Sequence, residues 1–120
     1  MSAILKELKS VSELDQALSE SKEKPVLLFK HSTTCPISAR AFREFKSHLN
    51  AADPNVSYRM ITVQTARPVS NEVAQRLQVQ HETPQAILIR DGREIWNASH
   101  FAITTAALED AIRKTGEQED

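Results

Sequence analysis

Residues 25–49 change from an apolar run to a helical pattern across a short polar stretch. The apolar run is Pro25–Phe29, which is typical of a strand covered on both faces of a sheet. Apolar side chains then recur at helical spacing in Ile37, Ala41, Phe42, Phe45 and Leu49. Pro36 suits the first turn of this helix, because that turn does not need the N–H that proline lacks. The segment therefore predicts a buried strand followed by a helix over Pro36–Ala51.

Cys35, the one cysteine of the chain, lies between this strand and this helix. A thiol at a helix start faces the positive end of the helix dipole and backbone N–H groups without helical partners. Both favour the thiolate, which is the reactive form. Free cysteine is also often a small buried apolar residue. The polar neighbours favour a reactive thiol over that alternative; they are His31, Ser32, Thr33 and Thr34.

The region before the apolar run carries a second helical pattern of leucine and alanine residues. We predict a helix over Ser12–Ser21, in which Ser12 and Asp15 form a weak capping box. A short edge strand over Ile4–Leu8 is a further candidate element.

The region after the second helix begins with an alternating pattern that predicts a strand over Val56–Val63. Arg67–Ser70 is expected to be a loop, and Ser70 is expected to cap the helix that carries Val73 and Leu77. A polar loop over Val79–Pro84 follows this helix.

The C-terminal region predicts a hairpin and a closing helix. Two candidate strands, Ala86–Ile89 and Glu94–Trp96, flank Asp91-Gly92, which is a strong signal for a two-residue β-hairpin. The closing helix is predicted over Ile103–Lys114 and is expected to end at Gly116, ahead of a frayed acidic tail.

The order of these elements predicts one α/β domain over residues 1–120. A strand, a crossover helix and a strand require a parallel pair with a right-handed connection, and the hairpin adds antiparallel strands. We therefore expect a mixed four-stranded central sheet flanked by helices. A chain of this length buries a sizeable core without disulfides or metals.

Composition excludes several function classes. The chain has 15 basic and 16 acidic residues that are interspersed, so we expect no nucleic-acid partner. Only two glycines are present, so neither a dinucleotide fingerprint nor a P-loop can be formed. No apolar stretch reaches the roughly 18 residues of a membrane span. The residues at the start lack the order of a secretory signal, which makes a cytoplasmic location the expectation.

The position of Cys35, together with Thr83-Pro84 just ahead of the hairpin, resembles the thioredoxin superfamily over nearly the whole chain. The resemblance implies a thioredoxin-like fold in which Pro84 is cis and lies beside the reactive sulfur. The residues alone would suggest an ordinary loop proline. Thioredoxins carry Cys-x-x-Cys, whereas this chain has Cys35-Pro36-Ile37-Ser38. A hydroxyl therefore replaces the resolving sulfur, and a two-thiol reductase cycle cannot run within one chain.

The segment His31–Ser38 resembles the Thr-Cys-Pro-Ile-Ser motif of the monothiol bacilliredoxin family. The stretches 64–71 and 96–100 also resemble that family. The resemblance implies an oxidoreductase that removes bacillithiol from bacillithiolated cytosolic proteins. Bacillithiol would be a co-substrate, and we expect no tightly bound cofactor. The four histidines share no metal-ligand spacing with Cys35, so we predict no metal site.

In the mechanism that this resemblance implies, the Cys35 thiolate attacks the bacillithiol sulfur and keeps the adduct. A second bacillithiol, or another redoxin with its reductase, then frees Cys35. The residues expected to bind the thiol are Thr34, Pro36, Ser38, Thr83 and Pro84.

Some of these side chains have alternative interpretations. The Ser38 hydroxyl is expected either to donate to the thiolate or to be a helix cap or a solvated group. His31 and His81 are candidate proton donors, and the alternative is a strand-end histidine whose hydrogen bonds go to the backbone. Lys30, Arg40 and Arg43 are interpreted as solvated charges or as cations that attract the carboxylates of bacillithiol.

Three other functions remain open on the sequence. The first is a one-cysteine peroxidase that uses Cys35. The second is a monothiol redoxin that carries an iron–sulfur cluster between two chains, although Pro36-Ile37 replace the Gly-Phe of such proteins. The third is a redox-inactive scaffold with the same fold.

Overall fold

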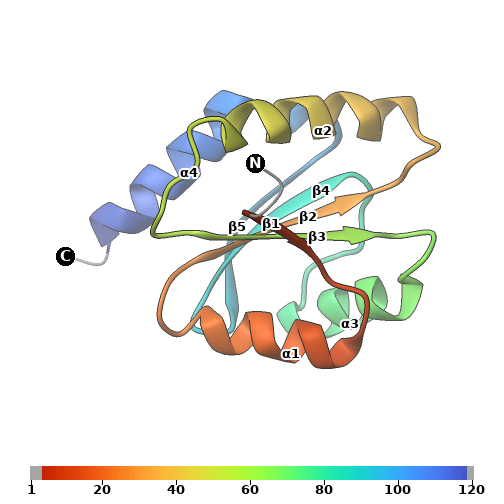
Figure 1. Cartoon of the computed structure of the whole chain (residues 1–120), viewed down its shortest axis with the longest axis horizontal. Helices are drawn as coiled ribbons and strands as arrows, with labels where there is room; N and C mark the ends of the chain where they lie inside the picture. Colours follow the sequence, from red (N-terminus) through yellow and green to blue (C-terminus); the bar gives the residue numbers. More distant parts are fainter. Residues whose placement is uncertain (1–3, 119–120) are drawn as a thin grey trace.

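A computed structural model of the chain describes residues 4–118. These residues form one five-stranded sheet in the order β1-β3-β2-β4-β5, with helices on both faces (Figure 1). The strands are β1 (Leu5–Glu7), β2 (Val26–His31), β3 (Ser57–Thr62), β4 (Gln85–Arg90) and β5 (Arg93–Ser99). The helices are α1 (Val11–Glu20), α2 (Pro36–Leu49), α3 (Arg67–Leu77), the 3-10 helix η1 (His100–Ala102) and α4 (Thr105–Gln118).

Strand β2 lies at the centre of the sheet and is buried along its whole length. Its side chains alternate between the two faces. Leu28 packs in a core with α1 and α3, whereas Leu27 packs in a second core with α2 and α4. Figure 1 shows these two helix pairs on opposite sides of the sheet. The prediction of a strand covered on both faces is confirmed, although the strand continues past Phe29 to His31.

The sheet is mixed, as predicted. Strand β2 is parallel to β3 and antiparallel to β4, and β4 is antiparallel to β5. Asp91 and Gly92 both have positive φ, at 55° and 72°, which suits the tight turn of the hairpin. The sheet has five strands rather than the predicted four, because the candidate edge strand over Ile4–Leu8 forms as β1 and pairs with β3. This strand has three residues, which is too few to show an alternating pattern.

Three predicted helix boundaries are wrong. Ser10, rather than Ser12, caps α1: the Glu13 N–H donates to Ser10 Oγ (3.2 Å), and Glu13 Oε1 accepts from the Lys9 N–H (2.6 Å). Both serines are followed three residues later by an acid, so the local pattern fits two positions.

The other two boundaries concern α3 and α4. Helix α3 begins at Arg67 with Pro68 in its first turn, so Ser70 lies inside the helix and is fully buried. Proline favours the first turn for the same reason as in α2. Helix α4 runs through Gly116 to Gln118, because a glycine weakens a helix by only about 1 kcal/mol and does not have to end it. The last two residues of the predicted acidic tail lie outside the described residues.

Candidate active site

Cys35 lies at the N-cap of α2, directly after the loop that follows β2. Its backbone is extended, with φ −105° and ψ 122°, and Pro36 occupies the first turn of the helix. The side chain is partly exposed and makes no capping hydrogen bond within the described chain. The sulfur is therefore available at a helix start, where the dipole favours a negative charge.

Ser38 fastens the loop before Cys35 to the start of α2. The Ser32 N–H donates to Ser38 Oγ (2.9 Å), and His31 Nδ1 lies 2.8 Å from the same oxygen. Ser38 is fully buried, so the interpretation of a solvated hydroxyl is wrong. These contacts direct the hydroxyl towards the loop.

His31 is buried on the α2 side of the sheet. Its ring stacks on Phe29 and lies 4.6 Å from the Phe42 ring, between centroids. Burial lowers the pKa of His31, and Lys46 lowers it further, while Glu7 opposes them. The imidazole is therefore neutral near pH 7, which fits a packed strand-end histidine better than a proton donor.

The peptide bond between Thr83 and Pro84 is cis, as the resemblance implied. Lys30 pairs with Gln85 across the β2–β4 ladder, so the end of β2 and the start of β4 lie side by side. The loop that leads to Cys35 and the Thr83-Pro84 turn therefore meet at one edge of the sheet. Here an open hollow of about 430 Å³ lies between the two loops and the end of β3; it is lined by Ser32, Thr34, Val63, Gln64, Arg67 and Thr83.

Gln64 ties the end of β3 to the loop before Cys35. Its Nε2 donates to Ser32 Oγ (2.8 Å) and Thr34 Oγ1 (3.2 Å), and its Oε1 accepts from the Thr33 N–H (3.3 Å). No motif in the sequence pointed to a role for Gln64 itself. The available signal was its place directly after a strand parallel to β2, since the carboxyl ends of parallel strands meet at the same edge of a sheet.

The comparisons with known proteins agree with this geometry. The sequence model of the family described as "Monothiol bacilliredoxin BrxC" matches residues 6–108. The chain belongs to the monothiol bacilliredoxin family. A solved structure described as that of a candidate oxidoreductase with a thioredoxin fold is 33% identical, covers 91% of this chain and 94% of its own, and has a TM-score of 0.80.

Two thioredoxins show the fold at lower identity. Thioredoxin O2 from Arabidopsis thaliana is 17% identical, with a TM-score of 0.73 over 95% of this chain and 96% of its own. The thioredoxin of Schistosoma mansoni is 24% identical, with a TM-score of 0.70 over 92% and 96%. The family and the thioredoxin fold make this chain a thiol-disulfide oxidoreductase with a single thiol.

This bacilliredoxin-family protein also carries a buried lysine behind the site. The interpretation of Lys30 as a surface charge is wrong, because the strand extends past Phe29 and Lys30 is fully buried. Its Nζ lies 3.2 Å from His81 Nδ1. Burial, and then the charge of Arg67, lower the pKa of Lys30 to about 8.

His81 connects this lysine to the cis-proline turn. Its Nδ1 is also 3.4 Å from Ser70 Oγ, and its Nε2 is 3.3 Å from Thr83 Oγ1. Burial lowers the pKa of His81, as do Lys30 and Arg67, while Glu82 raises it. The two candidate proton donors thus lie apart, with His31 at Ser38 and His81 at Thr83.

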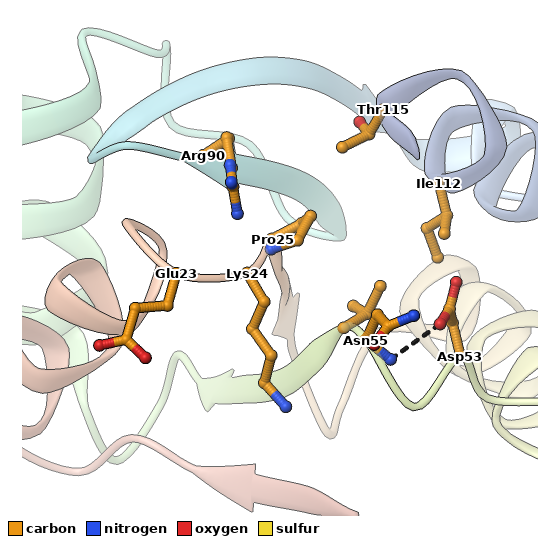
Figure 2. Close-up of a pocket in the computed structure, with 9 residues that line it drawn as sticks. Glu23, Lys24, Pro25, Asp53, Asn55, Arg90, Ile112 and Thr115 are labelled. Carbon is orange, nitrogen blue, oxygen red and sulfur yellow. Dashed lines mark hydrogen bonds between the residues drawn. The ribbon is translucent and has the colours of Figure 1, made fainter. Parts of the chain in front are cut away.

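A second hollow, of about 270 Å³, lies at the opposite end of β2 (Figure 2). It is lined by residues that include Pro25, Asp53, Arg90 and Thr115. Because Pro25 precedes β2 and Cys35 follows it, this hollow does not belong to the thiol site. Among residues 4–118, no group of three histidine, cysteine or acidic side chains is arranged to hold a metal ion. Over the same residues, no helix has the length and apolar character that crossing a membrane requires.

Proposed function

We propose that this bacilliredoxin removes bacillithiol from mixed disulfides on client proteins. The Cys35 thiolate attacks the bacillithiol sulfur, a new S–S bond forms, and the client sulfur leaves with the electron pair of the broken bond. Cys35 then carries bacillithiol. The observation that carries this proposal is the partly exposed lone thiol at the N-cap of α2, with a buried hydroxyl at the resolving position.

The hollow that is lined by Thr34, the residue before Cys35, suits the polar arms of bacillithiol. Ser32, Thr34, Gln64 and Thr83 offer hydroxyl and amide groups, and Arg67 offers a cation at the rim. Arg67 replaces Lys30 as the cation that we expect to meet the carboxylates, because the lysine amine is not on the surface.

The second half of the cycle needs a thiol from outside the chain. Ser38 cannot form a disulfide with Cys35, so the adduct persists until another thiolate attacks it. A second bacillithiol would release oxidised bacillithiol disulfide, and another redoxin with its reductase would serve the same purpose. In both cases two electrons from the external thiol reduce the Cys35 adduct.

Intact mass spectrometry tests the first half-reaction directly. The reduced protein is mixed with a client protein that carries one bacillithiol, and both masses are followed. We expect the client to lose one bacillithiol and this chain to gain it, whereas Cys35→Ser gains none. No transfer beside an active control redoxin would remove the proposal, and peroxide consumption far above that of a free thiol would favour the peroxidase alternative.

A further inference from the structure

Lys30 is a fully buried amine whose described hydrogen-bond partner is a histidine. Buried lysines are rare and are usually paired with carboxylates, because an isolated buried charge is costly. Directly across the ladder lies Gln85, which is 1% exposed and whose Oε1 has no protein hydrogen-bond partner in the described chain. Gln85 is thus a neutral ladder neighbour of the lysine, and His81 is the acceptor that the amine contacts. A buried amine on the strand that leads to Cys35 is therefore a candidate functional group.

The direction of the hydrogen bonds that start at Lys30 follows from which side-chain atoms can donate and which can accept. An ammonium group only donates, so His81 Nδ1 accepts from it. The neutral imidazole then carries its proton on Nε2, which donates to Thr83 Oγ1. The Thr83 hydroxyl has accepted one hydrogen bond, so its own proton is free to point into the hollow that Thr83 lines.

We propose that Lys30 and His81 act through Thr83 as a buried proton relay that protonates the thiolate leaving the mixed disulfide. This inference rests on the proposed exchange reaction. As the S–S bond breaks, the leaving sulfur takes the Thr83 hydroxyl proton. Thr83 takes the Nε2 proton of His81, and His81 Nδ1 takes a proton from Lys30 Nζ. Lys30 is left as a neutral amine that regains its proton from solvent between turnovers.

The charged groups around the relay suit this task. Arg67 from α3 lowers the pKa of both Lys30 and His81, and Glu82 in the loop before β4 raises that of His81. Ser70 from α3 and Gln85 from β4 face the pair as neutral groups. A proton donor works best when its pKa lies near the working pH, and Lys30, at about 8, meets that condition better than an ordinary lysine.

The acidity of the leaving thiol provides a test that a structural role would not reproduce. A thiolate leaves more slowly as the pKa of its thiol rises, so proton donation should help an alkyl leaving group far more than an aromatic thiolate of low pKa. We would measure single-turnover transfer from two mixed disulfides of bacillithiol. One contains a cysteine peptide and the other contains 5-thio-2-nitrobenzoate. In both, Cys35 attacks the bacillithiol sulfur.

The matched variants are Thr83→Val, which removes the hydroxyl at nearly constant shape, and Thr83→Ser, which keeps it. We expect Thr83→Val to slow transfer from the peptide disulfide by about 10²-fold, at the low end of general-acid effects. Any lost contact between Thr83 and bacillithiol should slow both disulfides alike, so the ratio of the peptide rate to the aromatic rate should fall, because the aromatic leaving group needs no proton. Thr83→Ser should retain the wild-type rates on both.

Lys30→Met extends the test to the buried end of the relay. It should show the same substrate selectivity, and its rate on the peptide disulfide should lose the wild-type decline as the pH rises through about 8. Equal slowing of both substrates, or of neither, would overturn the relay. Wild-type protein that transfers bacillithiol from neither disulfide would instead remove the exchange reaction, and the relay with it.

Discussion

Ser38 is the residue on which the loop before Cys35 depends most directly. Its buried hydroxyl accepts from the Ser32 N–H and contacts His31 Nδ1. Ser38→Ala leaves the buried His31 ring and the partly buried Ser32 N–H without this partner, so we expect the free energy of unfolding to fall by about 1–3 kcal/mol. Urea denaturation of the reduced protein measures this change. Ser47→Ala on the exposed face of the same helix is the control, and an equal change in both variants would contradict the prediction.

Arg67 is the residue that we expect to select carboxylate-bearing thiols. A partly solvated ion pair of up to about 1 kcal/mol corresponds to about a fivefold change in affinity. Arg67→Gln should therefore raise the KM for bacillithiol in the recycling step by about that factor, and added salt should reduce the difference. Arg93→Gln, at the exposed start of β5 beside the hairpin turn, should leave the KM unchanged. A similar KM for bacillithiol in the Arg67 variant and the wild type would refute the role.

Single residues with unusual chemistry could be recognised without the structure. Cys35 between a strand and a helix and Pro36 in a first turn each carry a local signal, whereas the cis bond of Thr83-Pro84 was expected only through the resemblance to thioredoxins. No local sequence signal indicated the burial of Lys30, because lysine is usually a surface residue. Its position follows from the extra length of β2 and from its pairing with Gln85, which are tertiary facts.

One side chain, Gln64, ties the loop before Cys35 to the end of β3. Gln64→Ala removes the acceptor of the Thr33 N–H, so hydrogen exchange of that amide should accelerate several-fold. The bonds are exposed, so the free energy of unfolding should change by less than about 1 kcal/mol. Amide exchange followed by NMR measures the first effect. The control is Gln75→Ala on the exposed face of α3, which should leave the exchange rate of the Thr33 amide unchanged. An unchanged exchange rate in Gln64→Ala would contradict the prediction.

Helix α4 is attached to α2 at its first residue. The Thr105 N–H donates to Glu44 Oε1 (2.8 Å), and the Thr105 hydroxyl donates to the Glu44 carboxylate and carbonyl. The backbone hydrogen bond, followed by the hydroxyl, lowers the pKa of Glu44. The folded state therefore binds this proton less tightly than the unfolded chain. The resulting stability is present above the unfolded pKa of about 4.3 and is lost as the pH falls through the folded value.

Glu44→Gln tests this attachment through its pH dependence. The variant should be less stable than the wild type at pH 7, and the difference should shrink as the pH falls below about 4. Urea denaturation at both pH values gives the comparison. Glu23→Gln, a substitution at an exposed position between α1 and β2, should not change the free energy of unfolding at either pH. A difference between Glu44→Gln and the wild type that is the same at both pH values would contradict the ionic attachment.

Element types were easier to predict than element boundaries. The apolar run, the helical periodicity and Asp91-Gly92 carry their structure in local spacing, which is why β2, α2 and the hairpin were found. The start of α1 was ambiguous, because Ser10 and Ser12 fit the same capping pattern. Strand β1 is stabilised by its pairing with β3 at the sheet edge. Its three residues are too few for their sequence alone to predict a strand.

At the scale of the whole molecule, two apolar cores share one sheet. One core lies between the sheet and helices α1 and α3, and the other lies between the sheet and α2 and α4. Strands β2, β3 and β4 contribute side chains to both, because successive residues point to opposite faces. The position of the site depends on these shared strands, because Cys35 follows β2 and Thr83 precedes β4, with which β2 pairs.

Shared strands predict that the two cores unfold together as one domain. Leu27 and Leu28 are adjacent on β2 and fully buried on opposite faces, so each change to alanine should lower the free energy of unfolding by about 2–5 kcal/mol. The one tryptophan, Trp96, packs against the core that contains Leu27. Its fluorescence therefore reports on one face, whereas far-UV circular dichroism reports on the whole chain. Leu28 lies on the opposite face of the sheet from Trp96. If the domain is a single cooperative unit, Leu28→Ala shifts the fluorescence curve and the circular dichroism curve equally. A shift confined to circular dichroism would mean that the two cores unfold separately.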